Sequence, residues 1–425
     1  MLALVAALAC SNDDELSRSV KTSVLSDISV MGIRSVDDAI MIAQSVFSRE
    51  QTRLALNNIE VDDVVIVRND LSDGLQVNSD TLFYVVNYRN NKGFAIISAN
   101  PNVEALLAVV ERGHFSSESE TGVAGFDNFV KLAKQYLLSN KNSDRAQHPH
   151  AHIDTLITSS GPFLPVTWGQ SNYAGHYCPY GVCGCGPLAA AQVLSYYKYP
   201  TSIELTYSGA DMTTQSLNWN DIRQHQLYYE VDGYEDPTYC TASDSAHNSI
   251  GRLCRQLGEL SVSIYDNDST VSTTMFFLQN AMQLLGMSCD SIRYYSNQCT
   301  RASLARNRLI IMCGEHSNDA DSIPGHIWVV DGFYHKKIVI ADTVYYATGL
   351  NTPEYELVFT EINEYYNHIN WGWEGMFNGY FLDNVFMVSS NSAMLDSSPY
   401  SPYNVPDDYS DRTRYFVVYK KQTHG

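Results

Sequence analysis

The segment GVCGCGPLAAAQVLSYYKYP, residues 181–200, decides how this chain is organised. It opens with a glycine-rich turn, continues as an apolar run and ends at Pro200, which forbids further helix. Pro187 suits the first helical turn, which needs no amide hydrogen there. The segment therefore predicts a helix that opens at Cys185. The apolar positions that share one face of this helix are Leu188, Ala191 and Leu194.

A cysteine at the start of a helix has chemical consequences. The positive end of the helix macrodipole stabilises thiolate over thiol and lowers the thiol pKa. Because the thiolate is the reactive form, Cys185 is a candidate nucleophile. The same pattern also fits a small cysteine packed beneath a glycine turn.

Two polar residues follow Cys185 at intervals that suit thiol catalysis. His326 lies in PGHIWVVDGF, 326 − 185 = 141 residues downstream, and Asn370 lies in NHINWGWEG, 370 − 326 = 44 residues further on. A histidine about 130 to 150 residues after the cysteine is typical of the papain-like order. His326 would pair with the thiolate and protonate the leaving amine. Asn370 would orient its ring, and Trp371 would shield that hydrogen bond from water.

Other residues are candidates for parts of the same site. Acyl transfer needs donors for an oxyanion, and Gln170 in VTWGQSNY could supply one beside the backbone N–H of Cys185. Asp331 is an alternative orienting residue and His368 an alternative base. Each position also has a purely structural interpretation. His326 could be a core histidine, Asn370 could lie in an aromatic turn at a strand bend, and Gln170 could be a surface glutamine.

The composition restricts the class of protein. The chain has 425 residues, 44% of them apolar, which is enough for two or three domains, each with its own core. The net charge is −20, with 27 basic against 47 acidic residues. Nucleic-acid binding needs clustered Lys and Arg, so this balance argues against it. No run beyond the N-terminus approaches the roughly 18 apolar residues of a membrane span.

The first ten residues, MLALVAALAC, are apolar and end in small residues and Cys10, after which SNDDE is polar. This pattern resembles a lipoprotein signal in which Cys10 is acylated and becomes the new N-terminus. A simple secretory signal or a buried strand is the alternative. We therefore expect a membrane connection only through a lipid anchor at Cys10.

The remaining cysteines and histidines give no clear metal or disulfide pattern. Nine cysteines are irregularly spaced, and the pair Cys183 and Cys185 lacks the second ligand pair of a zinc site. His148, His150 and His152 alternate in a polar stretch, which is more typical of a linker than of a metal site. We expect no cofactor.

The N-terminal third has the pieces of a small α+β domain. Ser35 begins a capping signal before a helix that reaches Phe47. Residues 81–98 read as two strands joined by an Asn/Gly turn, and apolar positions at helical spacing over 126–137 predict a second helix. Residues 141–160 are polar and read as an exposed linker. The later segments mix strands and short helices without a βαβ rhythm, which favours an α+β fold.

Most of the chain, in order, resembles the streptopain family of cysteine proteases, including the interpain-type enzymes of Bacteroides and Prevotella. The resemblance lies in GCGPLAAAQVLSYYKYP, GQSNY, PGHIWVVDGF and HINWGWEGMFNGYF, in the intervening SLNWNDI, AHNSIGRLCRQLGELSVSIY and LARNRLIIMCGE, and in the N-terminal FYVVNYRNNKGFAIISANPNVEALLAVVERG. Two departures are the Gly186-Pro187 pair after the nucleophile and a bulky, acidic C-terminal loop, SSNSAMLDSSPYSPYNVPDDYSDRT.

The resemblance implies an organisation and an activity. It implies a signal or lipobox remnant over 1–10, an inhibitory propeptide over 11–145, a linker over 146–154 and a papain-like catalytic domain over 155–425. The activity would be that of a cysteine endopeptidase made as a zymogen, acting on proteins or peptides and inhibited by its own propeptide. The location would be secreted, or the outer membrane or cell surface of a Gram-negative bacterium. The site residues carried over are Cys185, His326, Asn370, Trp371 and Gln170.

Two rival functions use the same fold. One is a non-catalytic surface lipoprotein that binds proteins, and the other is an acyl transferase with the same triad. Loss of site residues would mark the first, but all the required residue types are present.

Overall fold

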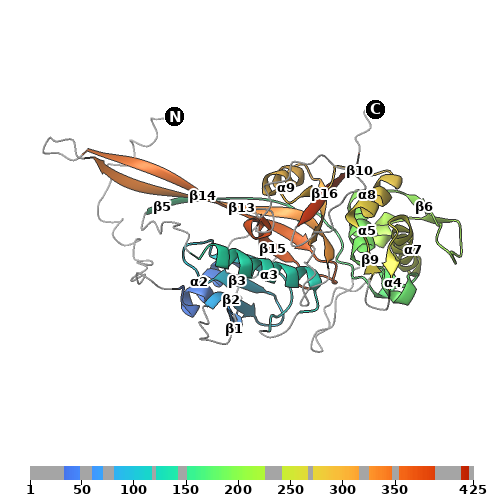
Figure 1. The fold of residues 1–425 in the computed structure, drawn as a ribbon, viewed down its shortest axis with the longest axis horizontal. Helices are drawn as coiled ribbons and strands as arrows, with labels where there is room; N and C mark the ends of the chain where they lie inside the picture. Colours follow the sequence, from blue (N-terminus) through green and yellow to red (C-terminus); the bar gives the residue numbers. More distant parts are fainter. Residues whose placement is uncertain are drawn as a thin grey trace.

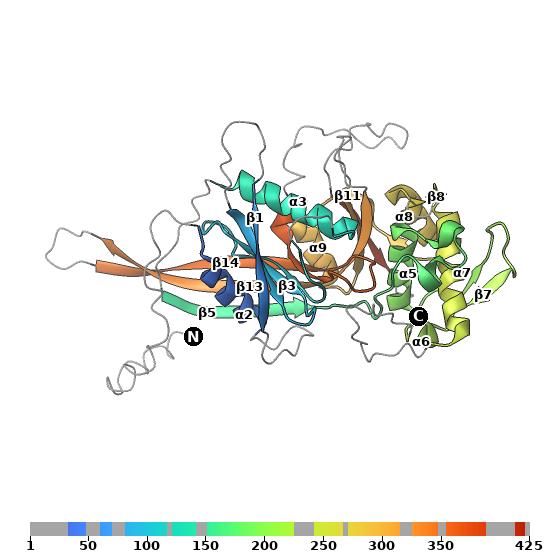
Figure 2. The same ribbon diagram turned by 90° about the horizontal axis from the view of Figure 1, so that it is seen from below.

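The computed structural model describes residues 33–47, 60–69, 81–116, 121–141, 151–224, 242–266, 271–314, 325–346, 354–387 and 413–420. Among these residues, one twelve-stranded sheet runs through the molecule, and its strand pairs are antiparallel. Helices pack on the sheet and form a cluster at one end (Figures 1 and 2). The predicted α+β class is confirmed.

The described helices are α2 (Val36–Phe47), α3 (Ala124–Ser139), α4 (Asn172–Gly175), α5 (Cys185–Tyr197), α6 (Trp219–Ile222), α7 (Asp244–Leu260), α8 (Met275–Leu284) and α9 (Asn297–Leu304), with short 3₁₀ turns η1 (Pro179–Gly181) and η2 (Asp383–Met387). The strands of the large sheet are β1 (Val61–Arg68), β2 (Thr81–Tyr88), β3 (Phe94–Ser98), β4 (Leu106–Val110), β5 (Ala151–Ser160), β10 (Ser288–Cys289), β11 (Arg293–Tyr294), β12 (Leu309–Gly314), β13 (His326–Tyr346), β14 (Glu354–Asn370), β15 (Gly379–Leu382) and β16 (Arg414–Tyr419). Two small ribbons pair β6 (Ser202–Glu204) with β7 (Thr214–Ser216) and β8 (Ile264–Tyr265) with β9 (Val271–Ser272).

The N-terminal elements form where the local sequence predicts them. Ser35 and Asp38 cap α2 reciprocally, since Asp38 N donates to Ser35 Oγ at 3.1 Å and Ser35 N donates to Asp38 Oδ2 at 3.1 Å. The β2–β3 hairpin turns through Asn90 and Asn91, which have φ of 61° and 51°. Asparagine tolerates this left-handed backbone. The second predicted helix is α3, and it begins two residues before the predicted start.

The N-terminal region and the later region share one sheet and one of the apolar core clusters. The strand order β1-β2-β3-β4-β15-β14-β13-β12-β16-β10 joins them through β4 and β15. Phe126 of α3 stacks on Phe377 at a centroid distance of 4.8 Å, and Phe129 meets Phe381 edge to face, also at 4.8 Å. Each region also buries an apolar cluster made of its own residues, and a further cluster contains residues from both.

The helical cluster surrounds α5. Helices α7 and α8 pack against α5, and so does β13 (Figure 2). Residues 186–195 of α5 are all buried, so the helix is covered on every side and not on one apolar face alone. Its many alanines permit this, because small side chains let neighbouring elements approach closely.

The long β13–β14 hairpin projects from the body of the molecule (Figure 1). Strand β5 pairs with β13 from Phe333↔Ser160 to Ala341↔Ala151. Part of the predicted exposed linker is therefore a strand, and the pairing includes the last residues assigned to 146–154. Backbone pairing with β13 and β-branched residues, which favour strands, form this edge strand. It has no alternating apolar pattern, and its Leu156 side chain is 54% exposed.

No described helix is both long enough and apolar enough to cross a membrane.

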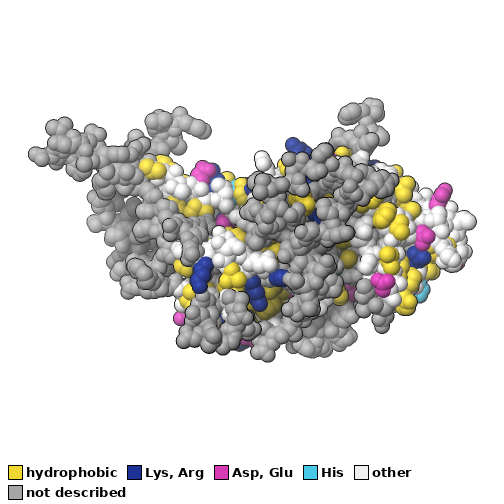
Figure 3. All heavy atoms as spheres, viewed as in Figure 1, with side chains coloured by type: hydrophobic (Ala, Val, Ile, Leu, Met, Phe, Trp, Pro, Cys, Tyr) yellow, Lys and Arg dark blue, Asp and Glu magenta, His cyan; other side chains and the backbone are white. Residues whose placement is uncertain are grey.

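Hydrophobic and acidic side chains both show on the helical end of the face in Figure 3. Cys10, His148, His150 and the C-terminal loop at 388–412 lie outside the described residues.

Candidate active site

Cys185 is the first residue of α5, as the sequence predicts. The residue before it, Gly184, has φ of +86°, and a Cβ there would lie 2.6 Å from Val271 Cγ1. Only glycine fits this tight turn. Pro187 lies within the first turn of the helix, so the Gly186-Pro187 departure leaves the helix start in place. The thiol is partly buried at the positive end of the helix dipole.

His326 opens β13 and lies beside the thiol. Burial raises the pKa of the Cys185 thiol, but the charge of His326 and a hydrogen bond with its ring outweigh burial and lower that pKa. The backbone N–H groups of Ile327 and Gly186 lower it further. Burial conversely lowers the pKa of His326, and the Cys185 thiolate raises it above its ordinary value. These opposite shifts favour a thiolate–imidazolium pair.

The ring of His326 is held by the backbone next to Asn370. His326 Nε2 lies 2.8 Å from the carbonyl oxygen of Trp371, and the histidine is 4% exposed. Trp371 is fully buried, and its Nε1 donates to Phe377 O at 2.9 Å. The sequence prediction gave Trp371 a shielding role, and the structure shows its carbonyl in direct contact with the imidazole.

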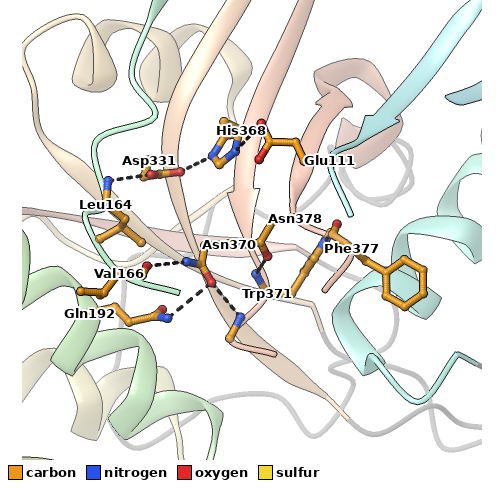
Figure 4. Close-up of polar contacts among 11 residues, drawn as sticks. Glu111, Leu164, Val166, Gln192, Asp331, His368, Asn370, Trp371, Phe377 and Asn378 are labelled. Carbon is orange, nitrogen blue, oxygen red and sulfur yellow. Dashed lines mark hydrogen bonds and ion pairs between the residues drawn. The ribbon is translucent and has the colours of Figure 1, made fainter. Parts of the chain in front are cut away.

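Asn370 makes hydrogen bonds other than the predicted one. Its Oδ1 accepts from Gly372 N at 2.9 Å and from Gln192 Nε2 at 3.4 Å, while its Nδ2 donates to Val166 O at 3.1 Å (Figure 4). Both ends of the amide are therefore occupied by groups other than the His326 ring. Direct orientation of the imidazole by Asn370 is not seen in this form, and its catalytic role stays a prediction.

Gln170 lies at the turn that leads to Cys185. Its carbonyl oxygen accepts from Cys183 N at 2.9 Å, and its neighbour Gly169 forms a β-bridge with Trp373. The Gln170 segment is thus tied both to the nucleophile turn and to the loop that follows Asn370. This placement is compatible with the predicted oxyanion role, which also stays a prediction.

Asp331 and His368, the alternative site residues, pair with each other. Asp331 lies at a bulge where the β13–β14 register shifts between Val330 and Gly332. Its Oδ1 is 2.5 Å from His368 Nδ1, and its Oδ2 accepts from Leu164 N at 2.8 Å. No described hydrogen bond or ion pair joins either residue to Cys185 or His326. Their hydrogen bonds link β13, β14 and the backbone at Leu164 to one another.

Two residues that contact the site were missed by sequence reasoning. Gln192 follows Cys185 by seven residues, about two helical turns, and its Nε2 also donates to Trp168 O at 3.2 Å. A lone glutamine in an apolar helix was the available signal. Gly125 of α3 is the second, because a Cβ there would lie 2.7 Å from His326 Cδ2 and 2.4 Å from Trp371 Cε3. No local pattern points to this contact.

The described residues include no group of three or more His, Cys, Asp or Glu side chains arranged to hold a metal ion. The chemistry available at Cys185 is nucleophilic attack by the thiolate and proton transfer by the adjacent imidazole.

A helix-start thiol beside an imidazole, with a second region packed over the imidazole, defines a cysteine peptidase that still carries its propeptide. The chain matches the Peptidase C10 family over residues 168–381, half of its length, and the Spi protease inhibitor family over residues 31–137. The chain therefore belongs to the Peptidase C10 family, and its N-terminal region is an inhibitor-type propeptide.

Curated relatives agree with this assignment. Streptopain of Streptococcus pyogenes serotype M28 (strain MGAS6180) is 21% identical over 346 residues, which are 71% of this chain and 74% of the relative. The thiol protease/hemagglutinin PrtT of Porphyromonas gingivalis is 22% identical over 356 residues, 76% of this chain and 36% of the relative. Among solved structures, a fragment of Prevotella intermedia prointerpain A matches with a TM-score of 0.47 and 18% identity, covering 82% of this chain and 98% of that one.

Proposed function

We propose that this cysteine peptidase is an exported endopeptidase that cleaves proteins with Cys185 as nucleophile and His326 as acid and base. The observation that carries the proposal is the mutual effect of these two residues. His326 lowers the pKa of the Cys185 thiol, and the thiolate raises the pKa of His326. A thiolate at neutral pH attacks a peptide carbonyl without a separate activating step.

The first half-reaction forms an acyl-enzyme. The Cys185 sulfur attacks the carbonyl carbon, and the negative charge moves to the carbonyl oxygen. The backbone N–H of Cys185 and the Gln170 side chain donate hydrogen bonds to this oxyanion. Collapse of the tetrahedral intermediate breaks the C–N bond as His326 gives its proton to the departing amine.

The second half-reaction regenerates the enzyme. His326, now neutral, removes a proton from water, and the resulting hydroxyl attacks the thioester carbon. The C–S bond breaks, the carboxylic acid leaves, and the thiolate–imidazolium pair is restored. Asn370 supports both steps by fixing the backbone around Trp371, whose carbonyl contacts the imidazole.

The test compares the full-length protein with Cys185→Ala in the presence of a thiol reductant and casein. The matched control is Cys299→Ala, which removes an exposed thiol elsewhere. We expect wild type and the control to degrade casein and process themselves, and Cys185→Ala to do neither. The processed chain should begin at or before Ala151, because the backbone of β5 from Ala151 onward is paired with β13 and is poorly accessible to cleavage.

A non-catalytic binding protein would give a different result. Wild type would then leave casein intact even after an added protease has cut the connecting segment, and a thiol-directed epoxide would fail to label Cys185. That outcome would refute the peptidase mechanism. Labelling without hydrolysis, with acyl transfer to an added amine, would favour an acyl transferase.

The exported location rests on the N-terminal segment. An apolar run that ends at Cys10 is compatible with lipid attachment at the outer membrane or cell surface of a Gram-negative bacterium. Expression in such a bacterium with a clickable fatty acid should label wild type and not Cys10→Ser. Equal labelling of both proteins would count against lipidation of Cys10.

A further inference from the structure

The propeptide contacts the catalytic part of the sheet at β15, the strand next to β4. Its strand β4 pairs with β15 in an antiparallel register that places Val109 opposite Tyr380. The ladder continues beyond β4, because Glu111 N donates to Asn378 O at 2.8 Å. A Cβ on Gly379 would lie only 2.1 Å from Val109 O, so the two strands approach very closely. This backbone pairing fixes where the next propeptide side chain points.

That side chain is the carboxylate of Glu111, and it points to His368. Glu111 Oε1 lies 3.6 Å from His368 Nε2, and Asp331 Oδ1 lies 2.5 Å from His368 Nδ1 (Figure 4). The side chains of Glu111, His368 and Asp331 are 21%, 6% and 1% exposed. A propeptide carboxylate and a catalytic-domain carboxylate therefore lie at opposite ends of one buried imidazole.

The two carboxylates favour a doubly protonated ring, although the Glu111 contact at 3.6 Å is an ion pair and not a hydrogen bond. A neutral imidazole donates from one nitrogen only, and that donor is used by Asp331. A proton on the second nitrogen gives His368 a positive charge that also faces Glu111. Burial lowers the pKa of His368, but the charges of Asp331 and Glu111 raise it to about 10. Water reaches this ion pair poorly, which makes its electrostatic interaction stronger than that of an exposed pair.

We propose that the His368–Asp331 pair is a recognition site for Glu111, and that this contact keeps the propeptide bound after the connecting segment is cut. The proposal rests on the zymogen assignment and adds a specific determinant to it. A cut in the connecting segment breaks neither the backbone pairing of β4 with β15 nor the ion pair. Processing and release of the propeptide are therefore separate events, and the second depends on one carboxylate.

The contact supplies selectivity that the apolar interface lacks. Aromatic side chains such as Phe126 and Phe377 can pack against many different apolar surfaces. A strand without a carboxylate at the position of Glu111 would instead leave the outer N–H of His368 buried without its charged partner, which is costly. The occupant that fits is therefore this chain's own propeptide strand, ending in Glu111.

The test measures release of the propeptide from full-length Cys185→Ala protein nicked by trypsin, which can cut after Arg145. Mass spectrometry verifies the cut, and gel filtration over time follows the separation of the two pieces. Glu111→Gln removes the charge and keeps the shape. The matched control is Glu60→Gln, which changes another propeptide glutamate. Glu60 forms an ion pair with Arg89, and the side chains of Arg89 and Glu60 are 59% and 66% exposed.

We expect Glu111→Gln to release the propeptide about tenfold faster or more, and Glu60→Gln to change the rate less than twofold. In a His368→Gln background, Glu111→Gln should have little further effect. Equal rates for the two glutamate variants would overturn the proposal, and this comparison stands even if His368→Gln fails to fold. Because Cys185→Ala has no nucleophile, the result is independent of whether the proposed hydrolysis is correct.

Discussion

At the scale of single residues, Gly184 determines where the nucleophile lies. Its φ of +86° is in a region that favours glycine, and a Cβ would collide with Val271. Gln192 and Asn370 act at the same scale, because their side chains tie α5, the segment around Trp168 and the end of β14 to one another. The site depends on these contacts as much as on the reacting groups.

Gly184→Ala should therefore damage both stability and reactivity. Backbone strain and the collision with Val271 together should cost about 2–5 kcal/mol. The free energy of unfolding in urea and the rate of Cys185 alkylation by iodoacetamide measure the two effects. Gly209→Ala is the control, since Gly209 has φ of +85° with nothing within 4 Å of its Cβ position. If both variants lose equal stability, the steric argument is wrong.

The pKa of His368, raised to about 10, predicts how stability changes with pH. The groups that face the ring are Asp331, Glu111 and the Tyr380 ring. A histidine whose pKa is higher in the folded state stabilises the fold fully below its unfolded value of about 6.5. This contribution is lost as the pH rises through about 10.

Urea unfolding of the Cys185→Ala protein from pH 6 to pH 10 measures this dependence. His368→Gln should show a smaller loss of stability over this range than its parent. The control variant is His335→Gln, which removes a histidine whose ring contacts the neutral side chains of Thr158 and Asn363. A His368→Gln slope equal to that of the parent would contradict the prediction.

At the scale of elements, the start of α3 lies directly over the catalytic histidine. The chain approaches so closely at Gly125 that any Cβ would meet His326 and Trp371. The sequence predicted α3 from its apolar spacing, yet that spacing gave no indication of which surface the helix covers.

Gly125→Ala should loosen this contact and accelerate processing. The added methyl group would push the start of α3 away from His326, so the processed form should appear several-fold sooner after addition of reductant. A gel time course of the full-length protein measures this. Gly122→Ala places the same methyl group where nothing lies within 4 Å and serves as the control. Unchanged processing by Gly125→Ala would argue against occlusion by α3.

At the scale of the whole molecule, the propeptide and the catalytic domain are joined by a common sheet and a common apolar cluster. Their strands join in one sheet through β4 and β15, and one apolar cluster contains side chains from both. Phe126 is fully buried in this cluster. Loss of the propeptide must therefore expose apolar surface around Phe377 and Phe381.

The full-length protein should consequently unfold in a single transition. Phe126→Ala should cost about 3–5 kcal/mol of stability and lower the midpoint of that one transition. Phe276→Ala, at a side chain that is 50% exposed on α8, should cost much less. Calorimetry or urea unfolding monitored by two probes would show the result. Two well-separated transitions in the parent protein would mean that the shared core does not couple the two parts.

The sequence by itself determined the helix that begins at Cys185, the α+β class, the N-terminal helices and hairpin, and the order of the site residues. These features follow from local rules, such as turn chemistry at Gly184 and apolar spacing along α3. The contacts of Asn370, the Asp331–His368–Glu111 group and the pairing of β5 came only from the tertiary structure. The register of β13 with β14, and of β4 with β15, brings these residues together from distant parts of the chain. No turn joins β4 to β15, so the local sequence of either strand does not show its partner, and burial of one face in the packed sheet sets their register.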